Sequence, residues 1–429
     1  MRKLITTIFA SFFLLFNVSL AVQALVTPPV ASADSVVLMD ATTGKILYEK
    51  NKNSAYPPAS TTKIMTILLV LERCNLNDVV TVSKNAEMAD GSKIYLFEGE
   101  KITVKELLYG LILASANDCA VALAEHVSGS TEKFALLMNE RASSLGCKNT
   151  NFVNPNGLYN VNHKTSAYAL ALIMQELTKH EEYKKIAITP SYAMASTNKS
   201  VEKRPLSNGN RLIQKNDQYY YKDCEGGKTG YTIQSQHSYI AVASRNGQKL
   251  IVALVHDSKK TFFGDSIKLL NYGFDNFELF KYFDINDEVS KATLDDGTSI
   301  PLLASRDFYI VKAKNSTEVS TPVIKTEEKN LKPSSILKGD KISKATITFD
   351  KDSYNLDLSS GVNYSKPSSP NNGFLKGDSE KSKSSAVLIK YFAIIIAVLI
   401  VFFRLSHIRR RKKNKLRKFA ANINSKDKT

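Results

Sequence analysis

Ser60 and Lys63 are the first residues whose types and spacing could do chemistry. They follow two prolines and precede an apolar, helix-forming run, so they lie one turn apart on one helical face. A serine hydroxyl becomes a good nucleophile when a base removes its proton, and a lysine with a lowered pKa can be that base. Free N–H groups at the helix N-terminus could hold an oxyanion. Alone, however, Ser-x-x-Lys is common, and a serine at this place is usually an N-cap.

A second pair, Ser115 and Asn117, stands at the end of an apolar helix predicted over residues 104–115. The Ser115 hydroxyl could pass a proton, and the Asn117 amide could hold a substrate amide through its donor and acceptor. Serine and asparagine also favour helix ends for purely local reasons. The pair is therefore weak as an isolated signal.

The third motif is Lys228-Thr229-Gly230, which we expect at the start of a strand hairpin. Lys228 adds positive potential, the Thr229 hydroxyl can hold a carboxylate, and Gly230 lets a substrate backbone approach the strand. A turn with a chance lysine is the structural alternative. The three motifs together are far more specific, with gaps of 55 residues from Ser60 to Ser115 and 113 from Ser115 to Lys228.

The elements that must position these motifs form an α/β pattern, which we place at residues 25–279. Residues 35–51 read as a hairpin, and Asn246-Gly247 joins two apolar runs in a second one. Helical patterns occupy 104–115, 118–127, 131–145, 165–179 and 261–279. Strands at both ends with helices between them predict one sheet closed by the first and last strands.

The remaining segments predict an exported, membrane-anchored chain. Residues 1–24 resemble a signal peptide, with a retained N-terminal anchor as the alternative, and 386–405 is an apolar span. Residues 280–363 alternate in short runs typical of a small all-β domain, and 364–385 has the composition of a linker. The basic tail at 406–429 is expected in the cytoplasm by the positive-inside rule. This arrangement predicts a single-pass protein of the cell membrane with its catalytic domain on the extracellular side.

The composition of the chain indicates which kinds of partner and cofactor to expect. The 429 residues have a net charge of +17, but residues 404–429 alone carry +10, so the charge does not indicate a nucleic-acid partner. The four cysteines, Cys74, Cys119, Cys147 and Cys224, have no metal-ligand spacing, and we expect free or optionally paired thiols. No metal or cofactor is predicted.

The three motifs, in this order, resemble those of the penicillin-binding proteins and class A β-lactamases. The chain is most similar to the serine-type D-alanyl-D-alanine carboxypeptidases, the low-molecular-mass penicillin-binding proteins, over about residues 33–279. That family also carries a β domain. The resemblance implies a penicillin-binding/β-lactamase-like transpeptidase fold, an antiparallel sheet flanked by helices. It also implies the substrate, a peptidoglycan stem peptide ending in D-Ala-D-Ala, and acylation by β-lactam antibiotics.

The resemblance also implies roles. Ser60 is expected to be the acylated nucleophile, Lys63 its general base and Ser115 the residue that transfers a proton to the leaving amine. The backbone N–H groups of Ser60 and Tyr231 are expected to form the oxyanion hole. The other expected substrate-binding residues are Asn117, Lys228, Thr229, Gly230 and Thr232.

Two departures from the family pattern and three rival functions remain. Asn156 stands where the family commonly has a histidine, and residues 258–265 lack the arginine that often helps to bind the substrate carboxylate, so Thr229, Thr232 or a nearby lysine is expected there. A β-lactamase would need a deacylating glutamate, which the loop from Asn154 to Tyr159 lacks. The second rival function is that of a peptidoglycan D,D-endopeptidase, and the third is that of a non-catalytic wall-binding homologue.

Overall fold

The computed structural model describes residues 27–316, 319–327 and 335–366. The predicted signal peptide, the predicted span at 386–405, the basic tail and nearly all of the predicted linker lie outside these residues. Within the described residues, no helix is long and apolar enough to cross a membrane.

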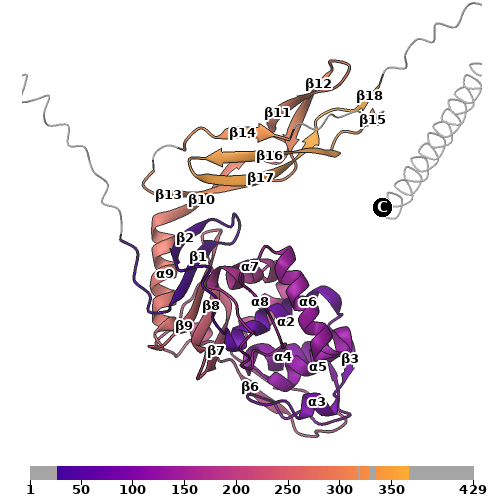
Figure 1. Cartoon of the computed structure of the whole chain (residues 1–429), viewed down its shortest axis with the longest axis vertical. Helices are drawn as coiled ribbons and strands as arrows, with labels where there is room; N and C mark the ends of the chain where they lie inside the picture. The colour runs from indigo at the N-terminus through magenta and orange to yellow at the C-terminus, as the bar shows by residue number, and fades with distance from the viewer. Residues whose placement is uncertain (1–26, 317–318, 328–334, 367–429) are drawn as a thin grey trace, which may run out of the picture. The chain divides into compact units, whose positions relative to one another are not determined.

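One antiparallel sheet of five strands organises the N-terminal domain (Figure 1). Its strands, in spatial order, are β2 (Ile46–Lys50), β1 (Ser35–Asp40), β9 (Gln248–Asp257), β8 (Gln236–Arg245) and β7 (Cys224–Thr232). β1 pairs with β9, so the first and last parts of the domain meet in the sheet as predicted. β7 lies at one edge, and its outer side is free of strand partners among the described residues.

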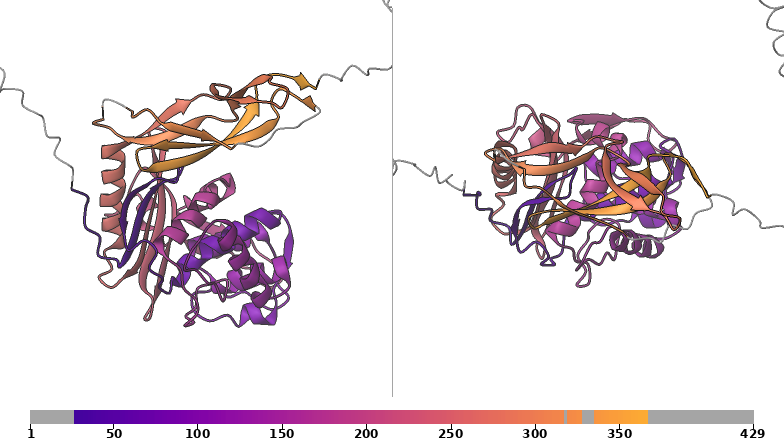
Figure 2. Two further views of the ribbon diagram at one scale, coloured as in Figure 1. Left: turned by 45° about the horizontal axis from the view of Figure 1, so that its top comes forward. Right: turned by 90° about the horizontal axis from the view of Figure 1, so that it is seen from above.

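Side chains alternate between the two faces of the sheet, and in β1, β8 and β9 the residues on both faces are largely buried. Val36 and Leu38 of β1 point into a core shared with α9 (Phe262–Asn276), whereas Val37 and Met39 point into the larger helical core. Figure 2 shows α9 on one side of the sheet and the other helices on the opposite side. The sheet is therefore a rigid support that holds β7 against the helical side.

The helical side confirms the helices expected from the hydrophobic pattern, with ends displaced by a few residues. Its elements are η1 (Ala59–Thr62), α2 (Lys63–Arg73), α3 (Lys84–Glu87), α4 (Val104–Leu113), α5 (Asn117–Ser128), α6 (Thr131–Ser144), α7 (Ala167–Leu177) and α8 (Glu181–Ala187). The hydroxyl of Ser166 accepts a hydrogen bond from the N–H of Ala169 and so caps α7. Two short antiparallel strand pairs complete this side: β3 (Val79–Thr81) with β4 (Lys101–Thr103), and β5 (Ser191–Met194) with β6 (Arg204–Ser207).

Two sequence expectations need correction. The helix predicted over 261–279 ends at Asn276, and the alternation that begins at Phe277 makes the next residues a strand. The Lys228 motif lies inside β7 instead of opening it, because the strand already begins at Cys224. The glycine pair before Lys228 has the composition of a turn, yet both residues are paired with β8.

The C-terminal part is all-β, as predicted. Strand β10 (Phe277–Phe283) pairs with β13 (Phe308–Ala313). A second sheet has the order β11, β12, β17, β16, β14, and β15 (Ser335–Ile336) pairs with β18 (Tyr364–Ser365). The strands of the second sheet are β11 (Glu288–Thr293), β12 (Ser299–Ala304), β14 (Val323–Thr326), β16 (Lys341–Phe349) and β17 (Asp352–Ser360). Their apolar side chains, Ile347 and Leu358 among them, form a separate core.

Candidate active site

The site is built around the start of α2. Ser60 lies in the 3-10 turn η1, which leads directly into α2 at Lys63. The residue before the serine, Ala59, has a φ of +50°, a left-handed conformation that costs free energy for a residue with a Cβ. Strained backbone conformations of this kind cluster at active sites, where they fix the orientation of a reactive side chain. Here the strained residue directly precedes Ser60.

Lys63 is fully buried, and three oxygen atoms surround its amine. Nζ lies 2.9 Å from Ser60 Oγ, 2.7 Å from Asn117 Oδ1 and 2.7 Å from the backbone oxygen of Asn156. Burial lowers the pKa of Lys63 well below its usual range, and the positive charge of Lys228 lowers it further. The lowered pKa favours the neutral form of the amine that contacts the serine.

This geometry fixes where the lone pair of a neutral Lys63 points. The Asn156 carbonyl and the Asn117 amide oxygen can only accept, so they take the two N–H bonds of the neutral amine. The charged amine also donates to Ser60 Oγ; once the amine is neutral, its lone pair faces this hydroxyl and can accept its proton. The arrangement is that of a base aimed at one hydroxyl.

Asn117 and Ser115 sit between α4 and α5. Asn117 begins α5, and its Nδ2 donates to the backbone oxygen of Asp90 at 2.5 Å, which leaves Oδ1 directed at Lys63. Ser115, two residues earlier, has a φ of +58° and is half-buried. Its hydroxyl has no hydrogen-bond partner among the described residues, so the backbone alone sets its position.

The strand β7 brings the third motif to the serine. A Cβ on Gly230 would lie 2.8 Å from the Pro58 oxygen and 2.9 Å from the Ser60 nitrogen, so only glycine lets the strand pass this close. Lys228 is buried, its Nζ donates to the Thr229 oxygen at 2.9 Å, and burial lowers its pKa to about 7. Thr229 is half-buried beside it.

The last two residues of the predicted set differ in their surroundings. The Tyr231 ring is 57% exposed and stacks on His237, with ring centroids 4.4 Å apart. The Thr232 hydroxyl donates to Ser235 Oγ at 2.7 Å and accepts from the Ser235 N–H at 2.9 Å. The structure therefore uses the Thr232 side chain to form the turn between β7 and β8.

The segment that lacks the family arginine offers Lys260 near the same turn. Burial lowers the pKa of His237, which pairs with Tyr231 of β7, and the charge of Lys260 lowers this pKa further. The preceding turn is held by Asp257, whose carboxylate accepts from the N–H groups of Lys259 and Thr261. Lys260 itself has a φ of +56°.

Sequence reasoning missed the role of the loop that follows Phe152. It supplies the Asn156 carbonyl to Lys63, and Gly157 (φ +85°) packs so closely that a Cβ there would lie 1.9 Å from the Ala59 oxygen. Thr66 of α2 adds a hydrogen bond to the Pro155 oxygen at 2.6 Å. Backbone acceptors leave no mark on side-chain composition, although the Asn-Pro-Asn-Gly sequence does signal a tight turn.

A second supporting loop, residues 90–100, lies beside Asn117 and was also missed. Asp118 is buried and accepts hydrogen bonds from the N–H groups of Ile94 and Leu96, so the start of α5 grips this loop. Burial raises the pKa of Asp118, although the hydrogen bonds that its carboxylate accepts from backbone N–H groups act to lower it.

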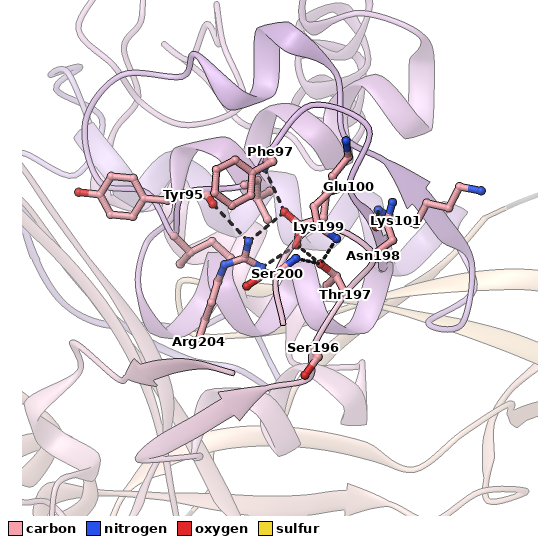
Figure 3. A network of polar contacts seen from close by, with 12 residues as sticks. Tyr95, Phe97, Glu100, Lys101, Ser196, Thr197, Asn198, Lys199, Ser200 and Arg204 are labelled. Carbon is pink, nitrogen blue, oxygen red and sulfur yellow. Dashed lines mark hydrogen bonds and ion pairs between the residues drawn. The ribbon is translucent and has the colours of Figure 1, made fainter. Parts of the chain in front are cut away.

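The far end of this loop is tied to the β5–β6 hairpin (Figure 3). The Arg204 guanidinium donates to both carboxylate oxygens of Glu100, at 2.7 and 2.9 Å, and Thr197 Oγ1 donates to the same carboxylate. Arg204 also reaches the Tyr95 oxygen. This buried ion pair opposes the effect of burial and holds the pKa of Glu100 below its usual value.

Comparison with known proteins identifies the family to which this chain is similar. Residues 22–259 match the family described as D-alanyl-D-alanine carboxypeptidase, and residues 277–356 match the penicillin-binding protein 5 C-terminal domain. The second match falls on the all-β part described above.

Individual relatives and solved structures support the same family. The chain is 38% identical over 291 residues to D-alanyl-D-alanine carboxypeptidase DacF of Bacillus subtilis, covering 66% of this chain and 73% of that protein. It is 32% identical over 340 residues to DacA of Haemophilus influenzae, covering 76% and 83%. Among solved structures, penicillin-binding protein 5 of Haemophilus influenzae superposes with a TM-score of 0.66 at 31% identity, over 80% of this chain and all of that one. The fold is therefore the penicillin-binding transpeptidase fold followed by a C-terminal all-β domain.

Proposed function

Because the chain belongs to the D-alanyl-D-alanine carboxypeptidase family, we propose that it removes the terminal D-alanine from peptidoglycan stem peptides through an acyl-enzyme on Ser60. The observation that carries this proposal is the Lys63 amine, buried and 2.9 Å from Ser60 Oγ, with two carbonyl-type acceptors for its own N–H bonds. A buried lysine in contact with a serine hydroxyl is typical of sites where the lysine activates the serine as a nucleophile.

Acylation begins when neutral Lys63 takes the Ser60 proton. Oγ attacks the carbonyl of the penultimate D-alanine, and the backbone N–H groups of Ser60 and Tyr231 stabilise the resulting oxyanion. Ser115 then gives its proton to the nitrogen of the leaving D-alanine and takes in its place the proton held by Lys63. The C–N bond breaks, and Lys63 is neutral again. The free side of the Ser115 hydroxyl supports this role, since it is available to a substrate.

The neighbouring side chains hold the substrate and the base. Lys228, whose charge favours the neutral form of Lys63, supplies positive potential where the peptide carboxylate must lie. Thr229 contributes a hydroxyl, and Gly230 leaves room for the peptide backbone along the edge of β7. Thr232 acts through the turn it forms, and the Asn117 amide positions both Lys63 and the acylated peptide.

Deacylation returns the enzyme to its starting state. Water attacks the ester carbonyl while Lys63 takes its proton. The C–Oγ bond then breaks, the proton passes from Lys63 to Ser60 Oγ, and the shortened stem peptide leaves with a free carboxylate. A β-lactam carries a strained amide in place of the scissile bond, so it would acylate Ser60 by the same steps. None of these steps uses a metal or a cofactor.

We also propose that the chain works outside the cell membrane. The support is in the sequence: a charged and then apolar start with a cleavage site after Ala24, an apolar segment at 386–405, and a basic tail that follows it. In this arrangement the catalytic and β domains face the cell wall. Protease protection of the tail in intact cells, with digestion of the catalytic domain, would test the orientation.

The activity is tested by measuring free D-alanine after incubation with a peptide ending in D-Ala-D-Ala, beside Ser60→Ala. We expect stoichiometric release by the parent protein and none by the variant. A cross-linked peptide dimer in a parallel reaction separates the carboxypeptidase from an endopeptidase. Equal release by Ser60→Ala would overturn the proposal.

A further inference from the structure

His163 is a buried titratable group that the mechanism above does not use. Only 1% of its surface is exposed, and the edge of the ring meets Phe152, with ring centroids 5.6 Å apart. Its Nδ1 lies 3.1 Å from the Val153 N–H, and its Nε2 lies 2.8 Å from Thr62 Oγ1.

These two contacts determine the tautomer. A backbone N–H can only donate, so Nδ1 must accept and carries no proton. The proton of the neutral ring is then on Nε2, which donates to the Thr62 hydroxyl. Burial lowers the pKa of His163 to about 4, in agreement with a ring that stays neutral.

Thr62 stands directly before Lys63, at the junction of η1 and α2, and is itself fully buried. Three hydrogen bonds therefore connect about one turn of helix to one loop, residues 153–163. They are Nε2 to Thr62, the Lys63 amine to the Asn156 oxygen, and Thr66 Oγ1 to the Pro155 oxygen. Two of them hold the turn at the start of the loop against α2, and the third, from His163, connects the end of the loop to the same helix.

We propose that His163 is a positioning residue, whose hydrogen bond to Thr62 holds the loop 153–163 against the start of α2 and so keeps the Asn156 carbonyl on the Lys63 amine. This inference rests on the proposed role of Lys63 as the base. If the loop moves away, the amine loses one acceptor and gains water. Its lone pair is then no longer confined to Ser60, and its neutral form is no longer favoured by burial.

The test uses the rate of acylation by a fluorescent penicillin, measured across pH, in full-length protein. His163→Asn keeps an acceptor for Val153 but no longer reaches Thr62, whereas His163→Gln places an amide donor near the former Nε2. We expect His163→Asn to slow acylation at neutral pH about tenfold, as a small misplacement of a catalytic group does. We expect His163→Gln to recover most of that loss.

The pH profile separates positioning from stability. The other titratable groups that act on the Lys63 amine are Lys228, Asp118 and the Cys119 thiol, and the variants leave all three in place. We therefore expect the acid limb of the acylation profile to move to higher pH in His163→Asn, because the pKa of Lys63 rises toward its usual value. A change in stability alone would not move this limb.

A matched control lies beside the same loop. Thr150 and Thr165 share a hydroxyl–hydroxyl hydrogen bond of 2.9 Å, which joins the segments that flank the loop without touching α2. Thr150→Val should lower the melting temperature and leave the acylation profile unchanged.

The outcomes are distinct. Should His163→Asn not fold, Thr62→Val removes the other end of the same hydrogen bond and must show the same shift of the acid limb. A parental rate and acid limb in either folded variant would overturn the inference. Absence of acylation in the parent protein would instead contradict the proposed function.

Discussion

The catalytic domain and the β domain bury different kinds of side chain. The catalytic domain encloses Lys63, Asp118, Lys228 and His163, each less than 5% exposed. In the described part of the β domain, the buried polar residues are only the serines Ser343, Ser359 and Ser360. Burying a charged or titratable group costs several kcal/mol unless it is paired, so such groups are not expected in a fold that needs only stability.

The difference indicates that packing determines the buried residues of the β domain, whereas the catalytic domain also buries residues that its chemistry requires. The β domain satisfies the alternation of its strands and gathers residues such as Ile347 and Leu358 in an apolar core. In the catalytic domain, the buried polar residues include Lys63, which contacts Ser60, and Asn117, which contacts Lys63. Substitutions in the two domains should therefore have separable effects, with the largest loss of turnover at Lys63 and the smallest in the β-domain core.

Lys63→Met removes the buried amine that we propose as the base. We expect acylation by penicillin to slow by about 10²–10⁴-fold, the range that a general base contributes. The melting temperature should change little, because the cost of burying the amine disappears together with its hydrogen bonds to Asn117 and Asn156. Stopped-flow labelling and calorimetry measure the two effects, and a rate within tenfold of the parent would remove Lys63 from the mechanism.

Lys228→Gln removes the charge that favours the neutral form of Lys63. Because that charge lowers the pKa of Lys63, its loss should raise this pKa and move the acid limb of acylation to higher pH. At neutral pH we expect a loss of about 10–100-fold. A pH profile of unchanged shape would show that Lys228 acts only on the substrate.

His163 should make the stability of the catalytic domain depend on pH while turnover at pH 7 is unaffected by its titration. Its folded-state pKa of about 4 lies below the usual value of 6.5, so the unfolded chain binds more protons between these values. The contribution of His163 to the free energy of unfolding is then fully present above pH 6.5. It is lost as the pH falls through 4, by about 3 kcal/mol in total. Chemical denaturation of the parent and of His163→Gln at pH 7 and pH 4 should show a smaller loss in the variant.

Ile347→Ala tests the β-domain side of the contrast. This side chain is fully buried in the β-domain core, and its truncation should cost about 2–4 kcal/mol of local stability. Acylation and D-alanine release should stay within about twofold of the parent, since no group near Ser60 changes. A large loss of turnover in the folded variant would tie the β domain to the chemistry.

Much of the site was predictable because side-chain type carries the signal. Ser60, Lys63 and Asn117 were predicted as a set, and the structure brings them into contact. The sheet closed by β1 and β9 also followed from the pattern of apolar runs. The predicted membrane segments fall outside the described residues and remain predictions.

The rest depends on tertiary contacts that no short pattern encodes. The carbonyl of Asn156 is a backbone group that every residue has, so nothing in its sequence marks it as a partner of Lys63. The pairing of Glu100 with Arg204 joins residues about a hundred positions apart. His163 belongs to an unremarkable polar stretch and becomes informative only when Thr62 is seen 2.8 Å from its ring.

The most direct test of the account is the intact mass of the protein after incubation with penicillin, followed by peptide mapping of the adduct. The account predicts one added penicilloyl group, located on Ser60 and absent from Ser60→Ala. An adduct on any other residue, or an unchanged adduct in the variant, would contradict the central claim that Ser60 is the nucleophile that Lys63 activates.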